Sequence, residues 1–369
     1  MRSLFIQSRF RLFVLAVSLL FGMAGISCLV AAHTLTLWSK QIKLGYLDAV
    51  VKHSLEIQSI SILLVTLFLI GVIVLSARYQ ALKGKLLFAS GSTLIVLLGS
   101  YAALCLYIYW NQDEIINKNN IIFQSQKAES ILSEAIQQSK LYGNSRIEEI
   151  NLVAPDHTQL SGWLIKNEVQ EKSPLIIYFG GAAEEVSDIL LPATKLKGWS
   201  VAAINYRGFG LSEGTPTQEN VFNDAALIYD YFIQRQDIDR ERIVSMGYSL
   251  GTGAAVHLSN HRATEGTVLV APFHNRTDKI SHLFHLSYFP MSVIFKQPFN
   301  SISVAPKIRT PLLCLIGDED KNTPNEISMR LVDKWGGKTY TKTIAGADHF
   351  LLFTRDEAWT EINAFLADL

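Results

Sequence analysis

The pentapeptide Gly247-Tyr-Ser-Leu-Gly251 contains the residue of this chain best suited to covalent chemistry. It follows the short apolar run Ile243–Met246 and precedes the small residues Thr-Gly-Ala-Ala. This order predicts a strand, a tight turn with Ser249 at its tip, and a helix, which together form a nucleophile elbow. Glycines on both sides of the serine suit a turn that a side chain would crowd. The alternative is an ordinary glycine-rich turn between a strand and a helix, so other residues must decide.

A serine hydroxyl needs a base within hydrogen-bond reach and a group that orients this base. His349 lies in Ala345-Gly-Ala-Asp-His349, directly after the predicted last strand Thr339–Ile344. In chain order, the base of an elbow serine comes last, so His349 is the predicted base. The other eight histidines lack this setting.

The orienting acid is expected between the serine and the histidine, at the end of a strand. The predicted strand Leu312–Ile316 is followed by Gly-Asp-Glu-Asp-Lys-Asn-Thr-Pro324. Spacing within this segment favours Asp320, with Asp318 as the second choice. An alternative role for these acids is to cap a helix that begins near Pro324.

Backbone N–H groups must also stabilise the charge that develops on the substrate oxygen. One predicted donor is Leu250, the residue after the nucleophile. The second is Ala182, in the loop Gly180-Gly-Ala-Ala-Glu184 that follows the predicted strand Leu175–Phe179. Small residues there allow a close approach of the backbone to a substrate.

Strand and helix patterns alternate from about residue 146 to the C-terminus, which predicts an α/β fold with a mostly parallel sheet. A leading hairpin is expected around Pro155-Asp-His157. The predicted strands are Ile147–Val153, Gln159–Ile165, Leu175–Phe179, Val201–Asn205, Ile243–Met246, Gly266–Val270, Leu312–Ile316 and Thr339–Ile344. The predicted helices are Glu185–Leu196, Glu219–Gln234, Leu250–Asn260, Asn325–Trp335 and Leu351–Leu369.

The first third of the chain is far more apolar than the rest. Uncharged apolar runs at 12–32, 57–76 and 86–110 are each long enough to cross a bilayer. We therefore predict a membrane domain over 1–110, a polar linker with one amphipathic helix over 111–145, and a catalytic domain over 146–369. Buried core helices are the alternative for all three runs, and a cleaved signal peptide is the alternative for the first.

Charge distribution predicts the orientation of these helices and excludes one class of partner. Arginines at 2, 9 and 11 and the basic loop between the second and third runs place the N-terminus in the cytoplasm. Three crossings would then put the catalytic domain on the periplasmic, lumenal or extracellular side. A formal net charge of zero gives no electrostatic case for nucleic acid. The three cysteines indicate no disulfide framework.

Several short segments from about residue 147 onward follow one another in the order of a known family pattern. They are Tyr178-Phe-Gly-Gly-Ala-Ala183, Asn205-Tyr-Arg-Gly-Phe-Gly-Leu-Ser-Glu-Gly214, Gly247-Tyr-Ser-Leu-Gly251, Ala271-Pro-Phe273, Asp320-Lys-Asn-Thr-Pro324 and Gly346-Ala-Asp-His349. On these segments the chain resembles the α/β-hydrolases, in particular a branch that includes membrane-anchored depalmitoylases and monoacylglycerol lipases. Asn205 stands where this branch commonly has an aspartate, and we expect this difference to affect only contacts of Arg207. Gly180 stands in place of a common histidine.

The residues and the resemblance together predict a serine hydrolase that transfers an acyl group to water and uses no metal or organic cofactor. An apolar, lid-like insertion over 272–310 favours a lipid-like ester or thioester as the substrate, and membrane lipids as neighbours. Ordinary packing over the sheet is the alternative for that insertion. Two alternative functions stay open: a serine aminopeptidase or amidase, and a catalytically silent binding module at the membrane. The sequence indicates no particular protein partner.

Overall fold

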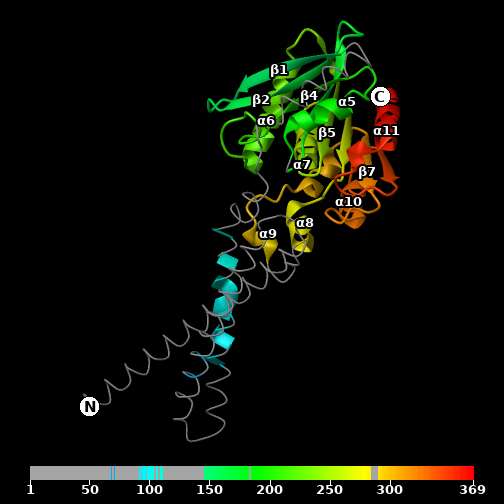
Figure 1. Ribbon diagram of the computed structural model, residues 1–369. Helices are drawn as coiled ribbons and strands as arrows, with labels where there is room; N and C mark the ends of the chain where they lie inside the picture. Colours follow the sequence, from blue (N-terminus) through cyan, green and yellow to red (C-terminus); the bar gives the residue numbers. More distant parts are fainter. Residues whose placement is uncertain are drawn as a thin grey trace, which may run out of the picture. The chain divides into compact units, whose positions relative to one another are not determined.

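The computed structural model describes residues 145–182, 184–283 and 290–369, together with scattered positions between 68 and 110 (Figure 1). The chain divides into two compact units. One comprises Met1–Asp113 with Phe284–Ile294, and the other comprises Glu114–Leu283 with Phe295–Leu369. The second unit contains the predicted catalytic domain.

The described residues of the first unit between 91 and 110 are helical. Most of the three predicted membrane-spanning runs, and nearly all of the predicted linker, lie outside the described residues. Within the described part of the chain, no helix is both long enough and apolar enough to span a bilayer.

An eight-stranded sheet with the order β1-β2-β4-β3-β5-β6-β7-β8 forms the centre of the second unit (Figure 1). β1 pairs with β2, and β2 with β4, in antiparallel register, whereas the pairs from β4 onward are parallel. The predicted mostly parallel sheet with a leading hairpin is therefore confirmed. The strands are β1 Ser145–Val153, β2 Gln159–Asn167, β3 Ser173–Phe179, β4 Ser200–Ile204, β5 Ile238–Tyr248, β6 Gly266–Val270, β7 Leu312–Gly317 and β8 Thr339–Ile344.

The sheet separates two hydrophobic clusters because successive side chains of a strand point to opposite faces. In β3, Leu175, Ile177 and Phe179 pack into a cluster with α6, α7 and α10, and Ile176 and Tyr178 pack into a cluster with α5 and α11. Burial on both faces explains why β3 is apolar from Leu175 to Phe179 instead of alternating. The α-helices among the described residues of this unit are α5 Leu190–Ala193, α6 Gln218–Phe232, α7 Gly251–His261, α8 Arg276–Leu283, α10 Asn325–Val332 and α11 Asp356–Ala367.

Two predicted helices each contain a separate 3-10 turn at their start. The segment predicted as Glu185–Leu196 forms a 3-10 turn, η3 Val186–Ile189, and then the single turn of α5. Pro192 fits only the first turn of an α-helix, so α5 begins just before it, at Leu190, and Val186–Ile189 form a separate turn. The last helix is likewise preceded by a separate 3-10 turn, η6 Leu352–Thr354.

The predicted insertion contains short elements. α8 and the 3-10 turns η4 Ser301–Ser303 and η5 Ala305–Lys307 belong to the second unit. α9 Met291–Ile294 belongs to the first unit. Its role as a lid stays a prediction.

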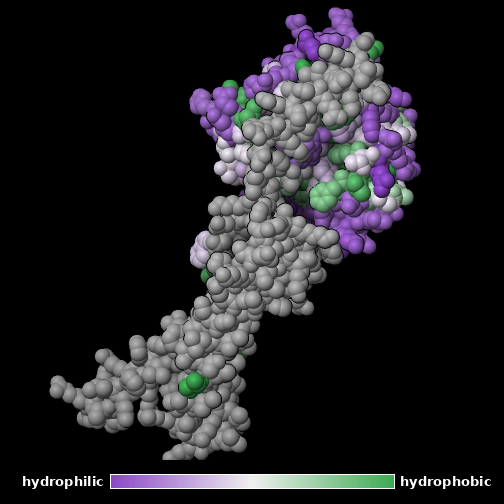
Figure 2. Space-filling view, viewed as in Figure 1, coloured by the Kyte–Doolittle hydropathy of each residue, from purple (hydrophilic) through white to green (hydrophobic). Residues whose placement is uncertain are grey.

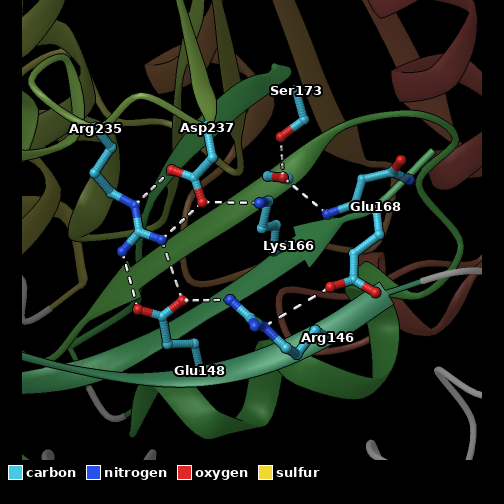
Figure 3. Close-up of polar contacts among 9 residues, drawn as sticks. Arg146, Glu148, Lys166, Glu168, Ser173, Arg235 and Asp237 are labelled. Carbon is cyan, nitrogen blue, oxygen red and sulfur yellow. Dashed lines mark hydrogen bonds and ion pairs between the residues drawn. The ribbon is translucent and has the colours of Figure 1, made fainter. Parts of the chain in front are cut away.

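Charged side chains fasten the hairpin to the start of β5 (Figure 3). Arg235 donates hydrogen bonds to Asp237 at 2.9 Å and to Glu148 of β1 at 2.9 and 3.1 Å. Lys166 of β2 lies 2.8 Å from the carboxylate of Asp237. We call these four residues the ion cluster. It lies where β5 begins, at the opposite edge of the sheet from Ser249.

Candidate active site

Ser249 lies at the junction between β5 and α7 in a left-handed backbone conformation, with φ of 48°. Such a conformation is strained for a residue with a side chain and is typical of functional turns. A Cβ on Gly247 would lie 2.3 Å from the carbonyl oxygen of Gly251, and one on Gly251 would lie 2.0 Å from that of Phe179. Both glycines of the motif are therefore required by close backbone contacts.

The structure brings Ser249, His349 and Asp320 together in one hydrogen-bonded chain. His349 Nε2 lies 2.9 Å from Ser249 Oγ, and His349 Nδ1 lies 2.7 Å from Asp320 Oδ2. All three residues are buried. They meet because β5, β7 and β8 are parallel and end at the same edge of the sheet.

The two candidate acids have different partners. Asp320 accepts the histidine through one oxygen, and through the other it accepts the N–H groups of Asn322 at 2.9 Å and Thr323 at 2.7 Å. Asp318 instead accepts the N–H group of Gly346 at 2.7 Å. The structure thus places Asp320, the first choice from the sequence, beside the histidine, and gives Asp318 a role in holding the loop after β8.

The environment of His349 favours its neutral form. Burial lowers the pKa of His349 below its ordinary value, the hydrogen bond to Asp320 opposes this shift, and the charge of Lys279 adds to it. Asp320 can accept a hydrogen bond from His349 only in the Nδ1–H tautomer, which leaves the Nε2 lone pair facing Ser249. At neutral pH the imidazole is therefore able to accept a proton from the serine.

The loop after β3 is held by polar groups, half-buried or buried, that the sequence patterns did not identify. Glu184 accepts the N–H group of Gly181 at 2.8 Å and the hydroxyl of Tyr178 at 2.7 Å. The hydroxyl of Tyr206 donates to the carbonyl oxygen of Gly180 at 2.9 Å. Burial raises the pKa of Glu184 to about 7. Glu184 already binds the N–H group of Gly181. The next amide along the loop that could donate to a substrate oxygen is therefore that of Ala182.

Tyr248, the variable residue before the serine, connects the loops of the site. Its hydroxyl donates to the carbonyl oxygen of His349 at 2.8 Å, and its ring centroid lies 5.4 Å from the imidazole. A Cβ on Gly181 would lie 3.1 Å from the same ring. No sequence pattern indicates this role, because it depends on contacts between distant segments.

Lys279 of α8 also reaches the nucleophile. Its Nζ lies 3.2 Å from Ser249 Oγ, and 5.5 Å from the centre of the Phe273 ring. Sequence reasoning missed this residue, because a single lysine on a polar helix resembles any solvent-exposed lysine. Among the described residues, no group of three or more His, Cys, Asp or Glu side chains is arranged to hold a metal ion.

The expectation for Asn205 is wrong. Its amide binds Glu185 at 2.7 Å and the N–H group of Val186 at 3.1 Å. Arg207 instead forms a two-pronged pair with Asp224 at 2.9 Å and also contacts Asp156. Having asparagine instead of aspartate at position 205 therefore affects the turn before α5. The amide of Asn205 can donate to the carboxylate of Glu185, whereas a second carboxylate could not.

Residues 170–304 match the family model described as serine aminopeptidase, S33. The chain is 30% identical over 194 residues to an α/β-hydrolase domain-containing protein, WAV2, of Arabidopsis thaliana, covering 48% of this chain and 63% of that protein. It is also 30% identical over 184 residues to the lysophosphatidylserine lipase ABHD12 of Danio rerio, covering 44% and 48%. The chain thus spans less than two thirds of the length of these relatives.

Solved structures show the same fold. The esterase Pf2001 of Pyrococcus furiosus superposes with a TM-score of 0.50 at 17% identity, covering 62% of this chain and 93% of the esterase. The acylaminoacyl peptidase of Pyrococcus horikoshii superposes with a TM-score of 0.51 at 18% identity, covering 63% and 43%. Residues 145–369 therefore have the α/β-hydrolase fold, and the chain resembles the serine hydrolases of that superfamily, as the sequence predicted.

Proposed function

We propose that this protein is a serine hydrolase that cleaves carboxylic ester or thioester bonds through an acyl-enzyme. The observation that carries the proposal is the buried chain of hydrogen bonds from Asp320 through His349 to Ser249, at 2.7 and 2.9 Å. Ser249 attacks the carbonyl carbon while His349 takes its proton, and His349 then gives this proton to the leaving group. Water repeats the sequence to release the acid, and Asp320 holds the imidazole in place.

The N–H groups of Leu250 and Ala182 are the proposed donors to the oxyanion. Leu250 directly follows the nucleophile at the start of α7. Ala182 follows Gly181, whose own N–H group is bound by Glu184. Removing one such donor typically costs about 10²–10³ in rate.

An apolar acyl substrate suits the surface beside the histidine. Phe350 is 69% exposed although its ring centroid lies only 5.4 Å from that of His349, and the adjacent Leu351 is 40% exposed. Figure 2 shows apolar patches on a surface of this unit that is otherwise largely hydrophilic. A relative named as a lysophosphatidylserine lipase also supports a lipid-like substrate.

Labelling with a fluorophosphonate probe tests the reaction class. Wild type is expected to label, and Ser249→Ala to lose both labelling and ester hydrolysis, by about 10⁴-fold or more. Ser245→Ala is a matched control, because Ser245 is a buried serine of β5, four residues before Ser249, whose hydroxyl donates to the backbone carbonyl of Ala255. A folded wild-type protein that does not label would support the alternative of a silent binding module.

The second candidate function is an aminopeptidase or amidase, because the matching family model carries that description. A series of p-nitrophenyl esters of increasing acyl length, measured beside an aminoacyl p-nitroanilide, separates the two. We expect the esters to be faster, with kcat/KM rising with chain length. Faster cleavage of the aminoacyl amide would reverse the assignment.

Membrane anchoring through the three N-terminal apolar runs remains part of the proposal. It rests on their length, their lack of charge and the arginines that precede them. An alkaline-phosphatase fusion after residue 145 is expected to be active, because that enzyme needs an oxidising compartment. A stable but inactive fusion would reverse the proposed orientation.

A further inference from the structure

Two nitrogen atoms contact the nucleophile oxygen of Ser249. His349 Nε2 lies at 2.9 Å and Lys279 Nζ at 3.2 Å. The contacts are chemically compatible, because the serine hydroxyl donates to the imidazole while an ammonium group, which can only donate, binds an oxygen lone pair. The usual triad accounts for the first contact and leaves the second without a role.

The charge of Lys279 is not neutralised by a carboxylate partner. Among the residues that the structure describes, no Asp or Glu oxygen lies within ion-pair distance of its Nζ. The adjacent Asp278 binds His274 at 2.8 Å, and Asp320 binds His349. The chain from Lys279 to Gly317 contains no Asp or Glu at all. Its positive charge therefore acts mainly on the nucleophile.

We propose that Lys279 is a further catalytic residue, whose ammonium group donates a hydrogen bond to Ser249 Oγ and stabilises negative charge there. The inference rests on the proposed hydrolase function. In acylation, Oγ bonds to the carbonyl carbon as His349 removes its proton. In deacylation, the bond from carbon to Oγ breaks, its electron pair returns to Oγ, and His349 returns a proton. Lys279 keeps its own protons in both steps.

The pH dependence expected from this geometry differs from that of a triad alone. Burial lowers the pKa of Lys279 to about 8, Asp320 opposes this shift, and Arg276 of the same helix adds to it. Lys279 in turn lowers the pKa of His349, whereas Asp320 and Asp348 raise it. The rate should rise as His349 loses its proton and fall again as Lys279 loses its own, which gives a bell-shaped profile.

The test compares kcat/KM of the full-length wild type, Lys279→Met and Lys279→Arg between pH 5 and 10 on a neutral p-nitrophenyl ester. Methionine keeps much of the volume without the charge. We expect a loss of about 10²-fold at pH 7 in Lys279→Met, as for other donors to developing charge. The alkaline limb should disappear, and the acid limb should move to higher pH. Lys279→Arg should recover part of the rate and stay active above pH 8.

A wild-type rate in Lys279→Met, an alkaline limb that persists in it, or a rate in Lys279→Arg no higher than in Lys279→Met would overturn the proposal. Lys307→Met is the matched control, since Lys307 is an exposed lysine of the same acid-free segment. A carboxylate-bearing ester is measured in parallel. A loss confined to that ester would assign Lys279 to recognition of substrate charge and would also overturn the proposal.

Fluorophosphonate labelling separates this inference from the proposed function. If wild type does not label, the hydrolase function fails whatever Lys279 does. If wild type labels and Lys279→Met labels at the same rate, only the role of Lys279 fails. Slower labelling of Lys279→Met, with unchanged thermal unfolding, supports both.

Discussion

Two groups of ionisable side chains at opposite edges of the sheet have contrasting electrostatics. In the ion cluster, Arg235 and Lys166 face two carboxylates, and each charge has an opposite partner within 3.1 Å. Around Ser249, two basic side chains share one hydroxyl oxygen, and Asp320 pairs with only one of them. Paired charges hold segments together, whereas an unpaired charge beside a reactive atom can act on it.

The pKa shifts follow the same contrast. Hydrogen bonds from Arg235 lower the pKa values of Asp237 and Glu148, which favours their charged forms. At the other edge, burial lowers the pKa values of Lys279 and His349 and raises that of Glu184, which favours neutral forms. Glu184 and Lys279 therefore have pKa values of about 7 and about 8, near the neutral pH at which proton transfer in catalysis takes place.

The largest expected effect after loss of the nucleophile is that of Asp320→Asn. An amide cannot stabilise the imidazolium and favours the wrong tautomer, so kcat/KM should fall about 10⁴-fold. Asp318→Asn is the matched control, two residues away in the same loop, and should stay within a few-fold of wild type. Equal losses in the two variants would show that the acid is wrongly assigned.

A smaller loss is expected at the loop after β3. Glu184→Ala removes the acceptor for the N–H group of Gly181, so the neighbouring amide of Ala182 should move, and kcat should fall about 10²-fold. In Glu184→Gln, the amide oxygen can accept from Gly181 while the amide nitrogen donates to the hydroxyl of Tyr178. This variant should keep most of the rate. A comparable loss in both variants would count against a positioning role.

The smallest effect on catalysis is expected in the ion cluster. Asp237→Asn should leave kcat/KM unchanged while lowering the free energy of unfolding by about 1–2 kcal/mol at neutral pH, measured by urea denaturation. Because the pKa of Asp237 is lowered in the folded state, its contribution is present above pH ~4 and is lost as the pH falls further. The variant should therefore lose less stability on acidification than wild type does. A marked loss of activity in Asp237→Asn would contradict the view that the ion cluster stabilises the fold and takes no part in catalysis.

Much of the fold could be predicted from the sequence because its signals are local. The apolar runs that became β3, β6 and β7, and the glycines around Ser249, depend on neighbouring residues and on simple burial. The segment after Glu184 was harder, because Pro192 converts an apparently continuous helix into two short turns. Local pattern gives the type of element more reliably than its ends.

The sequence by itself determined that a strained serine would stand after a strand, and that an acid and a histidine would follow it in order. Only the tertiary structure decided which groups reach that serine. His349 lies 100 residues from Ser249 along the chain and Lys279 lies 30 away, yet both contact the same oxygen atom. Strand order and helix packing create such contacts, and they depend on how distant segments share one edge of the sheet rather than on any local pattern.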